Sequence, residues 1–209
     1  MRLKWKVCGM RDPENIFQAL ELEPDFMGFI FYNKSPRYVG QQWSGPGADF
    51  PSTTKKVGVF VNADIIQVKF LAYKYELDCL QLHGYESPDY CRNLFASGYE
   101  IIKVINPHNI TDNKQLSTYT PWVHYFLFDT PSEQYGGTGH TFNWSMLEDY
   151  DNEKPVFLSG GISLNNINNI VALNKLNLAV VDINSCFETR PGLKDISKLK
   201  EFKTKLEQL

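Results

Sequence analysis

Eight short apolar runs, separated by turn signals, constrain the fold of this 209-residue chain more than any other feature. Their starts lie about 20 to 30 residues apart, which leaves room for one helix and two loops between successive runs. This spacing is typical of parallel strands joined by crossover helices. The runs cover residues 6–8, 26–31, 57–61, 79–82, 101–105, 125–128, 156–158 and 178–183.

Helix signals stand in several of the gaps. Asp12-Pro13 combines an N-cap residue with a proline at the first helical position and predicts a helix over 13–22. Asp64 is a second N-cap candidate, and residues 196–209 place apolar side chains along one stripe, as in a helix that covers a sheet. The alternation favours one closed (β/α)8 barrel over an open doubly wound sheet, and the sequence has no G-x-G-x-x-G fingerprint of a dinucleotide fold. We expect a single barrel domain over residues 1–209.

The connection after the second run breaks the pattern. Gly45-Pro46-Gly47 and Pro51 interrupt residues 40–54, where the second helix is expected. Glycine and proline both disfavour the interior of a helix. The second helix of the barrel is therefore predicted to be degenerate, that is, short or absent.

Composition and charge exclude several classes of protein. Hydrophobic residues make up 43% of the chain and charged residues 22%, which is too apolar for a disordered chain. No apolar run approaches the roughly 20 residues that a membrane span needs, and the start of the chain does not resemble a signal peptide, so we expect a cytoplasmic protein. A net charge of −3 offers no bulk attraction to nucleic acid or anionic lipid. Four cysteines without a C-x-x-C pair predict reduced thiols.

In a parallel barrel, the loops after the carboxyl ends of the strands build the active site. Polar residues that could act as a base, an acid and a cation stand at or after the ends of the apolar runs. Taken singly, each also has an ordinary structural explanation, such as a buried thiol, a turn or a helix cap. These residues are Cys8, Arg37, Asn62, His83, Asn106, Asp129, Ser159 and Asp182.

Three loops add to this set. Ser159-Gly160-Gly161-Ile162 and Asn184-Ser185 follow the last two runs, where barrels bind phosphate with backbone N–H groups. Glycine at such a place lets an oxyanion approach the backbone closely, although two ordinary tight turns stay an alternative. The glycine-rich segment 135–144 is longer than an ordinary connection and predicts a lid that excludes water.

Motifs at the strand ends follow one order over nearly the whole chain. They are Lys6-Val7-Cys8-Gly9-Met10, Gly28-Phe29-Ile30-Phe31, Lys34-Ser35-Pro36-Arg37-Tyr38-Val39, Val57-Gly58-Val59-Phe60-Val61-Asn62, Leu80-Gln81-Leu82-His83-Gly84, Phe128-Asp129, Gly136-Gly137-Thr138-Gly139, Leu158-Ser159-Gly160-Gly161-Ile162, Asp182-Ile183-Asn184-Ser185, Glu188 and Pro191-Gly192-Leu193-Lys194-Asp195. With these motifs the chain resembles the phosphoribosylanthranilate isomerase family, barrel enzymes of tryptophan biosynthesis.

The resemblance implies an intramolecular aldose–ketose isomerase without a metal or organic cofactor. The reaction would convert N-(5-phosphoribosyl)anthranilate to 1-(2-carboxyphenylamino)-1-deoxy-D-ribulose 5-phosphate by an acid/base Amadori rearrangement. The resemblance places Cys8 as the general base and Asp129 as the general acid. This chemistry needs a partly ionised thiol and a carboxyl that keeps its proton. We therefore expect a positive charge near Cys8, and desolvation or a negative neighbour such as bound substrate at Asp129.

The resemblance also implies the substrate contacts. Arg37 would pair with the anthranilate carboxylate, and Asp182 would contact the ribose hydroxyls or the anthranilate amine. The remaining contacts are His83 and Gly137 in the lining of the site, and Gly160, Gly161 and Ser185 at the phosphate.

The chain departs from the family pattern in places that remove no catalytic group. Asn143 stands where an acid usually follows the glycine-rich segment, and Asn184 and Cys186-Phe187 replace smaller residues. The expected partner is a small phosphosugar substrate, with no nucleic acid and no membrane, and the expected assembly is a monomer or a weak homodimer.

Other functions stay open. The related isomerase of histidine biosynthesis performs the same rearrangement, but it has an aspartate where Cys8 stands. A retro-aldol or epimerase barrel would need a Schiff-base lysine, and Lys103 could face the interior or serve as a structural ion-pair partner. A barrel that only binds phosphate ligands would not need both Cys8 and Asp129. Thiol redox or metal binding has little support, because the cysteines are unpaired and the four histidines are scattered.

Overall fold

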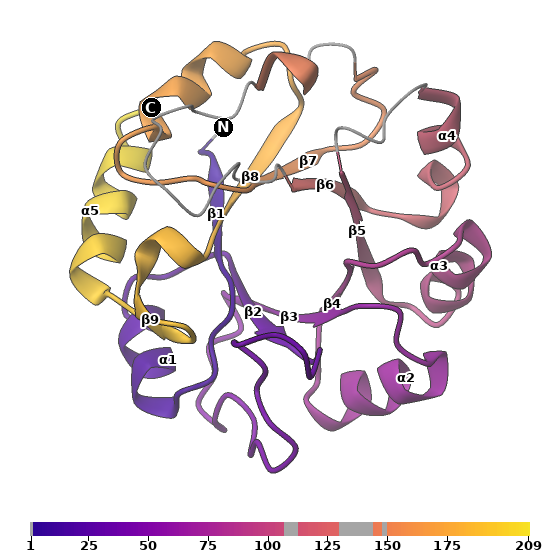
Figure 1. Ribbon diagram of the computed structural model, residues 1–209, viewed down its shortest axis with the longest axis horizontal. Helices are drawn as coiled ribbons and strands as arrows, with labels where there is room; N and C mark the ends of the chain where they lie inside the picture. Colours follow the sequence, from indigo (N-terminus) through magenta and orange to yellow (C-terminus); the bar gives the residue numbers. More distant parts are fainter. Residues whose placement is uncertain (1, 107–112, 130–143, 148–149) are drawn as a thin grey trace.

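Eight parallel strands close into a barrel in chain order, with β8 pairing back onto β1 (Figure 1). The computed structural model describes residues 2–106, 113–129, 144–147 and 150–209. Each strand matches one of the apolar runs to within two residues at either end, so the prediction of a (β/α)8 barrel is confirmed. The strands are β1 (Lys4–Val7), β2 (Phe26–Ile30), β3 (Lys55–Phe60), β4 (Cys79–Leu82), β5 (Glu100–Ile105), β6 (Tyr125–Asp129), β7 (Val156–Ser159) and β8 (Leu178–Ile183).

Helices surround the barrel, and side-chain caps fix where several of them begin (Figure 1). Asp12 accepts a hydrogen bond from the Asn15 backbone N–H, and Ser87 does the same for Tyr90. Among the described residues, no helix combines the length and the apolar character needed to cross a membrane. The α-helices are α1 (Pro13–Leu20), α2 (Ile65–Lys74), α3 (Pro88–Phe95), α4 (Asn113–Ser117) and α5 (Ile196–Leu206). Short 3-10 helices are η2 (Thr120–Trp122), η3 (Trp144–Leu147), η4 (Ile167–Leu173) and η5 (Ser185–Phe187).

No helix forms between β2 and β3, where every residue from 31 to 54 is described, so the predicted degenerate second helix is confirmed. Trp43 fills the gap on the outside of the barrel. Its ring lies 4.9 Å from those of Phe29 and Tyr75, measured between centroids. The Tyr75 hydroxyl donates to the Trp43 carbonyl at 2.8 Å. A packed aromatic cluster thus replaces the missing helix as cover for β2.

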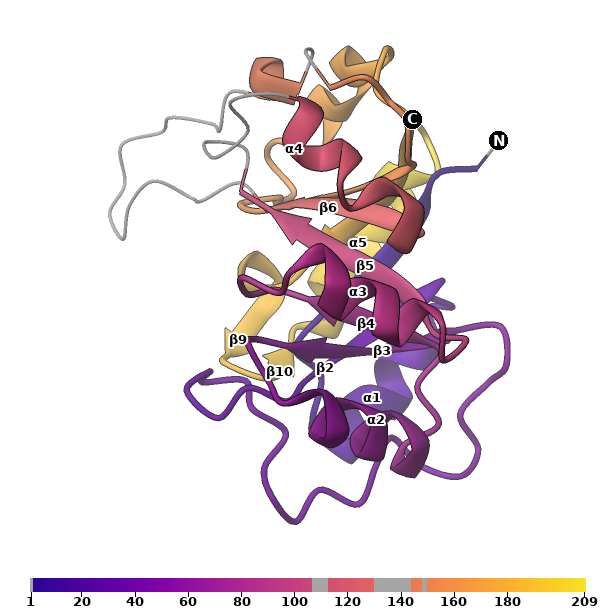
Figure 2. The ribbon, with the colours of Figure 1, turned by 90° about the vertical axis from the view of Figure 1, so that its right-hand side faces the viewer.

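A small hairpin follows η5 and precedes α5. Its strands are β9 (Glu188–Arg190) and β10 (Leu193–Lys194), and they pair antiparallel. Figure 2 shows the hairpin beside the barrel, on the side where β5 and β6 end. The hairpin therefore brings its side chains to the edge of the barrel mouth.

Side chains of alternate strand residues point into the barrel, because successive residues of a strand face opposite sides. The interior below the mouth is filled by an apolar cluster to which seven of the eight strands contribute buried residues. Phe157 is central to this cluster, since its ring lies 5.0 Å from those of both Phe26 and Tyr125. The barrel interior is consequently a packed core that closes the bottom of any site at the mouth.

Replacement of the central aromatic ring tests this packing. Phe157→Ala is expected to lower the free energy of unfolding by about 3–5 kcal/mol, because it leaves a cavity between two rings that cannot collapse onto it. Phe17→Ala, at a residue of α1 that is 66% exposed, is the matched control and should change stability by less than about 0.5 kcal/mol. Urea denaturation measures both. Equal losses would contradict the packing described here.

Candidate active site

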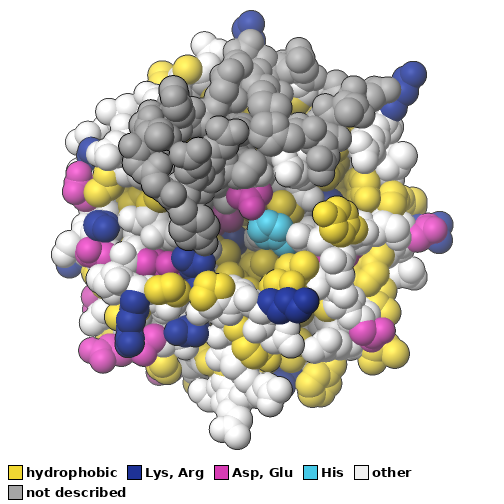
Figure 3. All heavy atoms as spheres, in the orientation of Figure 1, with side chains coloured by type: hydrophobic (Ala, Val, Ile, Leu, Met, Phe, Trp, Pro, Cys, Tyr) yellow, Lys and Arg dark blue, Asp and Glu magenta, His cyan; other side chains and the backbone are white. Residues whose placement is uncertain are grey.

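A cavity of about 270 Å³ lies at the mouth of the barrel. Figure 3 views this face and shows a histidine beside an acidic side chain near its centre, with hydrophobic side chains around them. A second hollow, of about 360 Å³, adjoins the first and shares His83 and Asp129 with it. The predicted site residues that line the first cavity are Cys8, His83, Asp129, Gly160, Gly161, Asp182 and Ser185. Gly137, the segment 135–143 and Asn143 lie outside the described residues.

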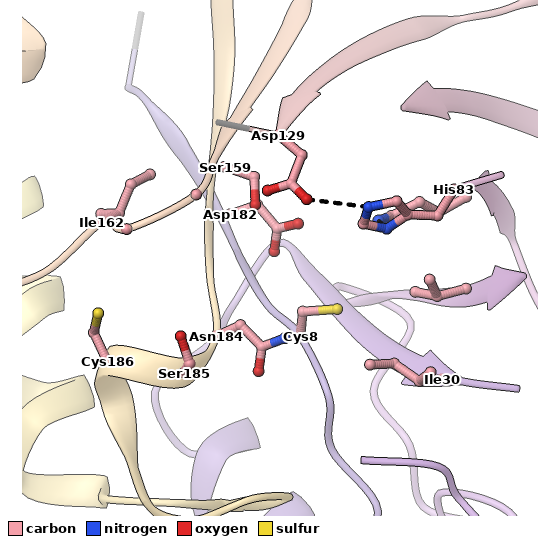
Figure 4. Close-up of a pocket in the computed structure, with 14 residues that line it drawn as sticks. Cys8, Ile30, His83, Asp129, Ser159, Ile162, Asp182, Asn184, Ser185 and Cys186 are labelled. Atoms are coloured by element: carbon pink, nitrogen blue, oxygen red, sulfur yellow. Dashed lines mark hydrogen bonds and ion pairs between the residues drawn. The ribbon is translucent and has the colours of Figure 1, made fainter. Parts of the chain in front are cut away.

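The alternation of the strands explains why these groups meet. Cys8 lies two residues beyond Lys6 on β1, and Asp129 two residues beyond Leu127 on β6, so each continues the inward-facing row of its strand. Figure 4 shows the Cys8 thiol and the carboxyl groups of Asp129 and Asp182 pointing into one space. Gly28 on β2 makes room for the thiol, since a Cβ there would lie 2.7 Å from Cys8 Sγ. The site thus combines a thiol and two carboxyls above the apolar core.

The two glycines after β7 both adopt a left-handed backbone. Gly160 has φ 88° and Gly161 has φ 63°, conformations that side chains other than glycine rarely adopt. Their loop faces η5, which begins at Ser185 directly after β8 (Figure 4). The two predicted loops are therefore neighbours that line the same end of the cavity.

Lys6 is a buried ammonium at the centre of the site. Its Nζ donates to Asp182 Oδ2 at 2.7 Å and to Gln81 Oε1 at 2.8 Å, and the side chain is fully buried. Burial disfavours the charged amine, but Asp182 and Cys8 outweigh it and raise the pKa of Lys6. The sequence interpretation missed this residue, although its position two residues before Cys8 puts it on the same face of β1.

Lys6 supplies the positive charge expected near Cys8, but that charge does not make the thiol acidic. Burial raises the pKa of Cys8, and the opposing effect of Lys6 is smaller, so the net shift is upward. In the unliganded protein the balance therefore favours the neutral thiol, because the residue is only 5% exposed.

Asp129 has its pKa shifted in the opposite direction from Cys8. Burial alone would raise this pKa, but the hydrogen bond and the charge of His83, with smaller contributions from Ser159 and Lys6, outweigh burial and lower it. His83 Nε2 lies 3.1 Å from Asp129 Oδ2. A hydrogen-bonded imidazole thus stabilises the carboxylate in the unliganded site, and the proton expected on Asp129 belongs to the site with substrate bound.

Asp182 is the second carboxyl of the cavity. Burial raises its pKa, against the attraction of Lys6. Its Oδ2 accepts from Lys6, whereas its Oδ1 is buried and has no hydrogen-bond partner among the described residues. A buried acceptor without a partner costs stability, which makes Oδ1 a place where a ligand N–H or O–H would be favourable.

Arg37 does not line the cavity, because Glu188 of the hairpin holds its guanidinium. Arg37 Nε lies 2.9 Å from Glu188 Oε1, and Arg37 Nη2 lies 2.6 Å from Oε2. Lys194 Nζ adds a further bond to Glu188 Oε1 at 2.7 Å. Burial opposes the charge of Glu188, but the two cations and the Gly192 N–H lower its pKa. The hairpin therefore fixes Arg37 beside the mouth, a contact that spacing along the sequence does not indicate.

Lys103 is a structural ion-pair partner, one of the two roles left open by the sequence. Its Nζ lies 3.0 Å from Glu86 Oε2, and it donates to the carbonyls of Leu82 and Gly84 at 3.1 and 2.7 Å. Both charged side chains are almost fully buried. The pair thus holds the backbone on either side of His83. Among the described residues, no group of three or more histidine, cysteine or acidic side chains could hold a metal ion.

The family model and the sequence relatives of this chain carry the same name. A family model described as N-(5'phosphoribosyl)anthranilate (PRA) isomerase matches residues 5–205. The N-(5'-phosphoribosyl)anthranilate isomerase of Parabacteroides distasonis is 46% identical over 199 residues, which cover 94% of this chain and 90% of that protein. The protein of the same name from Caldanaerobacter subterraneus is 37% identical over 201 residues, covering 96% of each.

Solved structures agree with the sequence relatives. The phosphoribosyl anthranilate isomerase of Thermotoga maritima superposes with a TM-score of 0.84 at 29% identity, covering 99% of this chain and 100% of that one. A phosphoribosyl anthranilate isomerase in complex with reduced 1-(o-carboxyphenylamino)-1-deoxyribulose 5-phosphate superposes with a TM-score of 0.81 at 26% identity and the same coverage.

Alkylation of Cys8 tests the pKa shift. Because its pKa is raised above the ordinary 9.0, the rate of reaction with iodoacetamide should climb about tenfold per pH unit and show no plateau up to pH 9. Peptide mass spectrometry gives the rate, and the exposed Cys186 serves as an internal reference. A plateau below about pH 8 would mean that the thiol ionises early, against the desolvation argument.

Proposed function

Since the chain belongs to the N-(5'-phosphoribosyl)anthranilate isomerase family of tryptophan biosynthesis, we propose that its Cys8 and Asp129 carry out an acid/base Amadori rearrangement at the barrel mouth. The observation that carries this proposal is that a thiol and a carboxyl line one cavity with the glycine loop after β7. An aldose-to-ketose isomerisation needs two such groups, one to give and one to take a proton. We place this biosynthetic reaction in the cytoplasm as part of the same proposal.

Asp129 acts first, as the acid. It protonates the furanose ring oxygen, the bond from that oxygen to C1 breaks, and the nitrogen lone pair forms the C1=N bond of a protonated imine. Asp129 is ionised in the unliganded site, so it must gain its proton on binding. The phosphate and carboxylate of the substrate are both negative, and nearby negative charge raises the pKa of a carboxyl.

Cys8 acts second, as the base. It removes the proton from C2, and the electron pair of that C–H bond forms the C1=C2 bond of an enolamine while the imine nitrogen becomes neutral. The protonated imine brings a positive charge into the site. That charge and Lys6 together favour the thiolate at the step that needs it. Loss of the C2 hydroxyl proton and protonation of C1 then give the ketone.

The remaining residues bind and orient the substrate. Gly160, Gly161 and Ser185 line one end of the cavity, and their two loops hold the phosphate there. The unpartnered Asp182 Oδ1 accepts from a ribose hydroxyl or from the amine. Arg37, which Glu188 orients beside the mouth, pairs with the carboxylate of the anthranilate ring in this proposal.

Particular residues argue against the alternative functions. Cys8 stands where the histidine-pathway enzyme has an aspartate. Lys103 is held in an ion pair, and the raised pKa of Lys6 keeps that amine protonated, so neither favours Schiff-base chemistry. A barrel that only binds phosphate would have no use for a thiol and a carboxyl in the same cavity.

The catalytic pair is tested by single substitutions. Cys8→Ala and Asp129→Asn should each lower kcat by about 10²-fold or more, because a positioned acid or base contributes that much. The substrate is generated in situ, turnover is followed by anthranilate fluorescence, and the product is identified by mass. Cys91→Ala, at a buried cysteine of α3, is the control and should keep wild-type turnover. Wild-type turnover in Cys8→Ala would remove the thiol from the mechanism.

The role of Arg37 has its own test. Arg37→Lys should raise KM by about tenfold and change kcat less, because an ammonium cannot pair with a carboxylate through two parallel hydrogen bonds. Arg190→Lys is the matched control, because Arg190 is exposed and lies on the β9–β10 hairpin that also carries Glu188. Unchanged KM in Arg37→Lys would exclude the assigned contact.

A further inference from the structure

A continuous chain of polar contacts crosses the barrel mouth along the wall of the cavity. It runs from Asp182 to Lys6 at 2.7 Å, from Lys6 to Gln81 at 2.8 Å, and from Gln81 Nε2 to His83 Nδ1 at 3.4 Å. It ends with the 3.1 Å contact of His83 Nε2 with Asp129 (Figure 4). Gln81 is the middle member, it is 2% exposed, and neither the family resemblance nor the proposed function gives it a role.

The charge of Lys6 fixes the orientation of the Gln81 amide. An ammonium can only donate hydrogen bonds, so the group of Gln81 that faces it at 2.8 Å must be the carbonyl oxygen Oε1. The amide NH₂ then faces His83, and an NH₂ group can only donate. His83 Nδ1 must therefore accept, and in a neutral imidazole the proton is then on Nε2.

We propose that Gln81 is a positioning residue: its amide, oriented by Lys6, selects the His83 tautomer whose Nε2–H points at Asp129. This inference rests on the proposed role of Asp129. The Nε2–H occupies Oδ2, which fixes the direction of the carboxyl that carries the proton to the substrate. In the other tautomer, the lone pair of Nε2 would face the Asp129 carboxylate. That contact would be repulsive, and it would neither stabilise the charge of the carboxylate nor fix its direction.

Two groups act on the His83 ring from its surroundings, the Gln81 amide and the Asp129 carboxylate. The backbone on both sides of the ring is held by the Lys103 ammonium, which accepts no hydrogen bond and contacts carbonyl oxygens rather than the ring. Among the described residues, the ring nitrogens have polar contacts with Gln81 on one side and Asp129 on the other. The carboxylate, which can only accept, favours Nε2–H, and the Gln81 NH₂ favours the same tautomer by donating to Nδ1.

Histidine tautomers can be read directly in the full-length protein. Long-range ¹H–¹⁵N spectra of ¹⁵N-histidine-labelled protein, recorded at about pH 8 where histidine is ordinarily neutral, distinguish Nε2–H from Nδ1–H. His83→Asn assigns the signals among the four histidines. Wild type should show the Nε2–H form. Gln81→Leu removes one of the two groups that favour Nε2–H and should add a minor Nδ1–H form, and Gln81→Glu, which puts an acceptor opposite Nδ1, should place a proton on Nδ1.

Kinetics connect the tautomer to the reaction. Gln81→Glu should lower kcat at least about tenfold and leave KM within about twofold, because the defect concerns the acid and not substrate contacts. Gln67→Leu and Gln67→Glu, on the exposed face of α2, are matched controls, and circular dichroism checks the fold of every variant.

The outcomes separate the two proposals. If His83 keeps its Nε2–H form in both folded Gln81 variants, or if Gln81→Glu retains wild-type kcat, the positioning role is overturned and the isomerase assignment stands. If the wild type shows no isomerase turnover while the tautomer shifts as described, the proposed function fails and the selection of the tautomer by Gln81 stands.

Discussion

The active site depends on one buried charge, the ammonium of Lys6. An isolated charge in the interior of a barrel is strongly unfavourable, so its partners must be in place, and removing one partner of a buried pair typically costs about 3–5 kcal/mol. Asp182 and Gln81 provide these partners from two other strands. The contact with Asp182 joins β1 to β8, the pair that closes the barrel, and the contact with Gln81 joins β1 to β4. Closure of the fold and alignment of the site are thus effects of the same set of bonds.

Much of the fold could be predicted, because the signals that define it are local. The apolar runs located all eight strands, and Asp12 and Asp64 mark helix starts by chemistry that operates within three residues. The absence of a helix between β2 and β3 followed from the glycines and prolines at 45–51. What could not be predicted is how that gap is covered. Trp43 packs between Phe29 and Tyr75, which are distant in sequence, and only the closed barrel brings these rings together.

The candidate site, too, could be predicted only in part. The positions of Cys8, His83, Asp129 and Asp182 at one mouth follow from the rule that strand ends meet in a parallel barrel. Their pairings do not, because they depend on side-chain reach across the barrel. The bond between Arg37 and Glu188 spans 151 positions of sequence. The pKa shifts depend on these pairings and on burial together, which is why the ionisation of Cys8 and Asp129 in the unliganded site could not be predicted from sequence. Alternation along β1 and β4 would have identified Lys6 and Gln81 as inward-facing, though not as partners.

The ionisation of Cys8 and Asp129 in the unliganded site is consistent with acid/base catalysis, because the substrate brings further charges. Without substrate, the protein itself stabilises a neutral thiol beside Lys6 and an ionised Asp129 beside His83. A bound phosphate and carboxylate add negative charge, which pushes Asp129 toward its protonated form. Ring opening then adds a cation at C1, which pulls Cys8 toward the thiolate. The order of the two steps is therefore set by the order in which charge appears on the substrate, and the acid must act before the base can ionise.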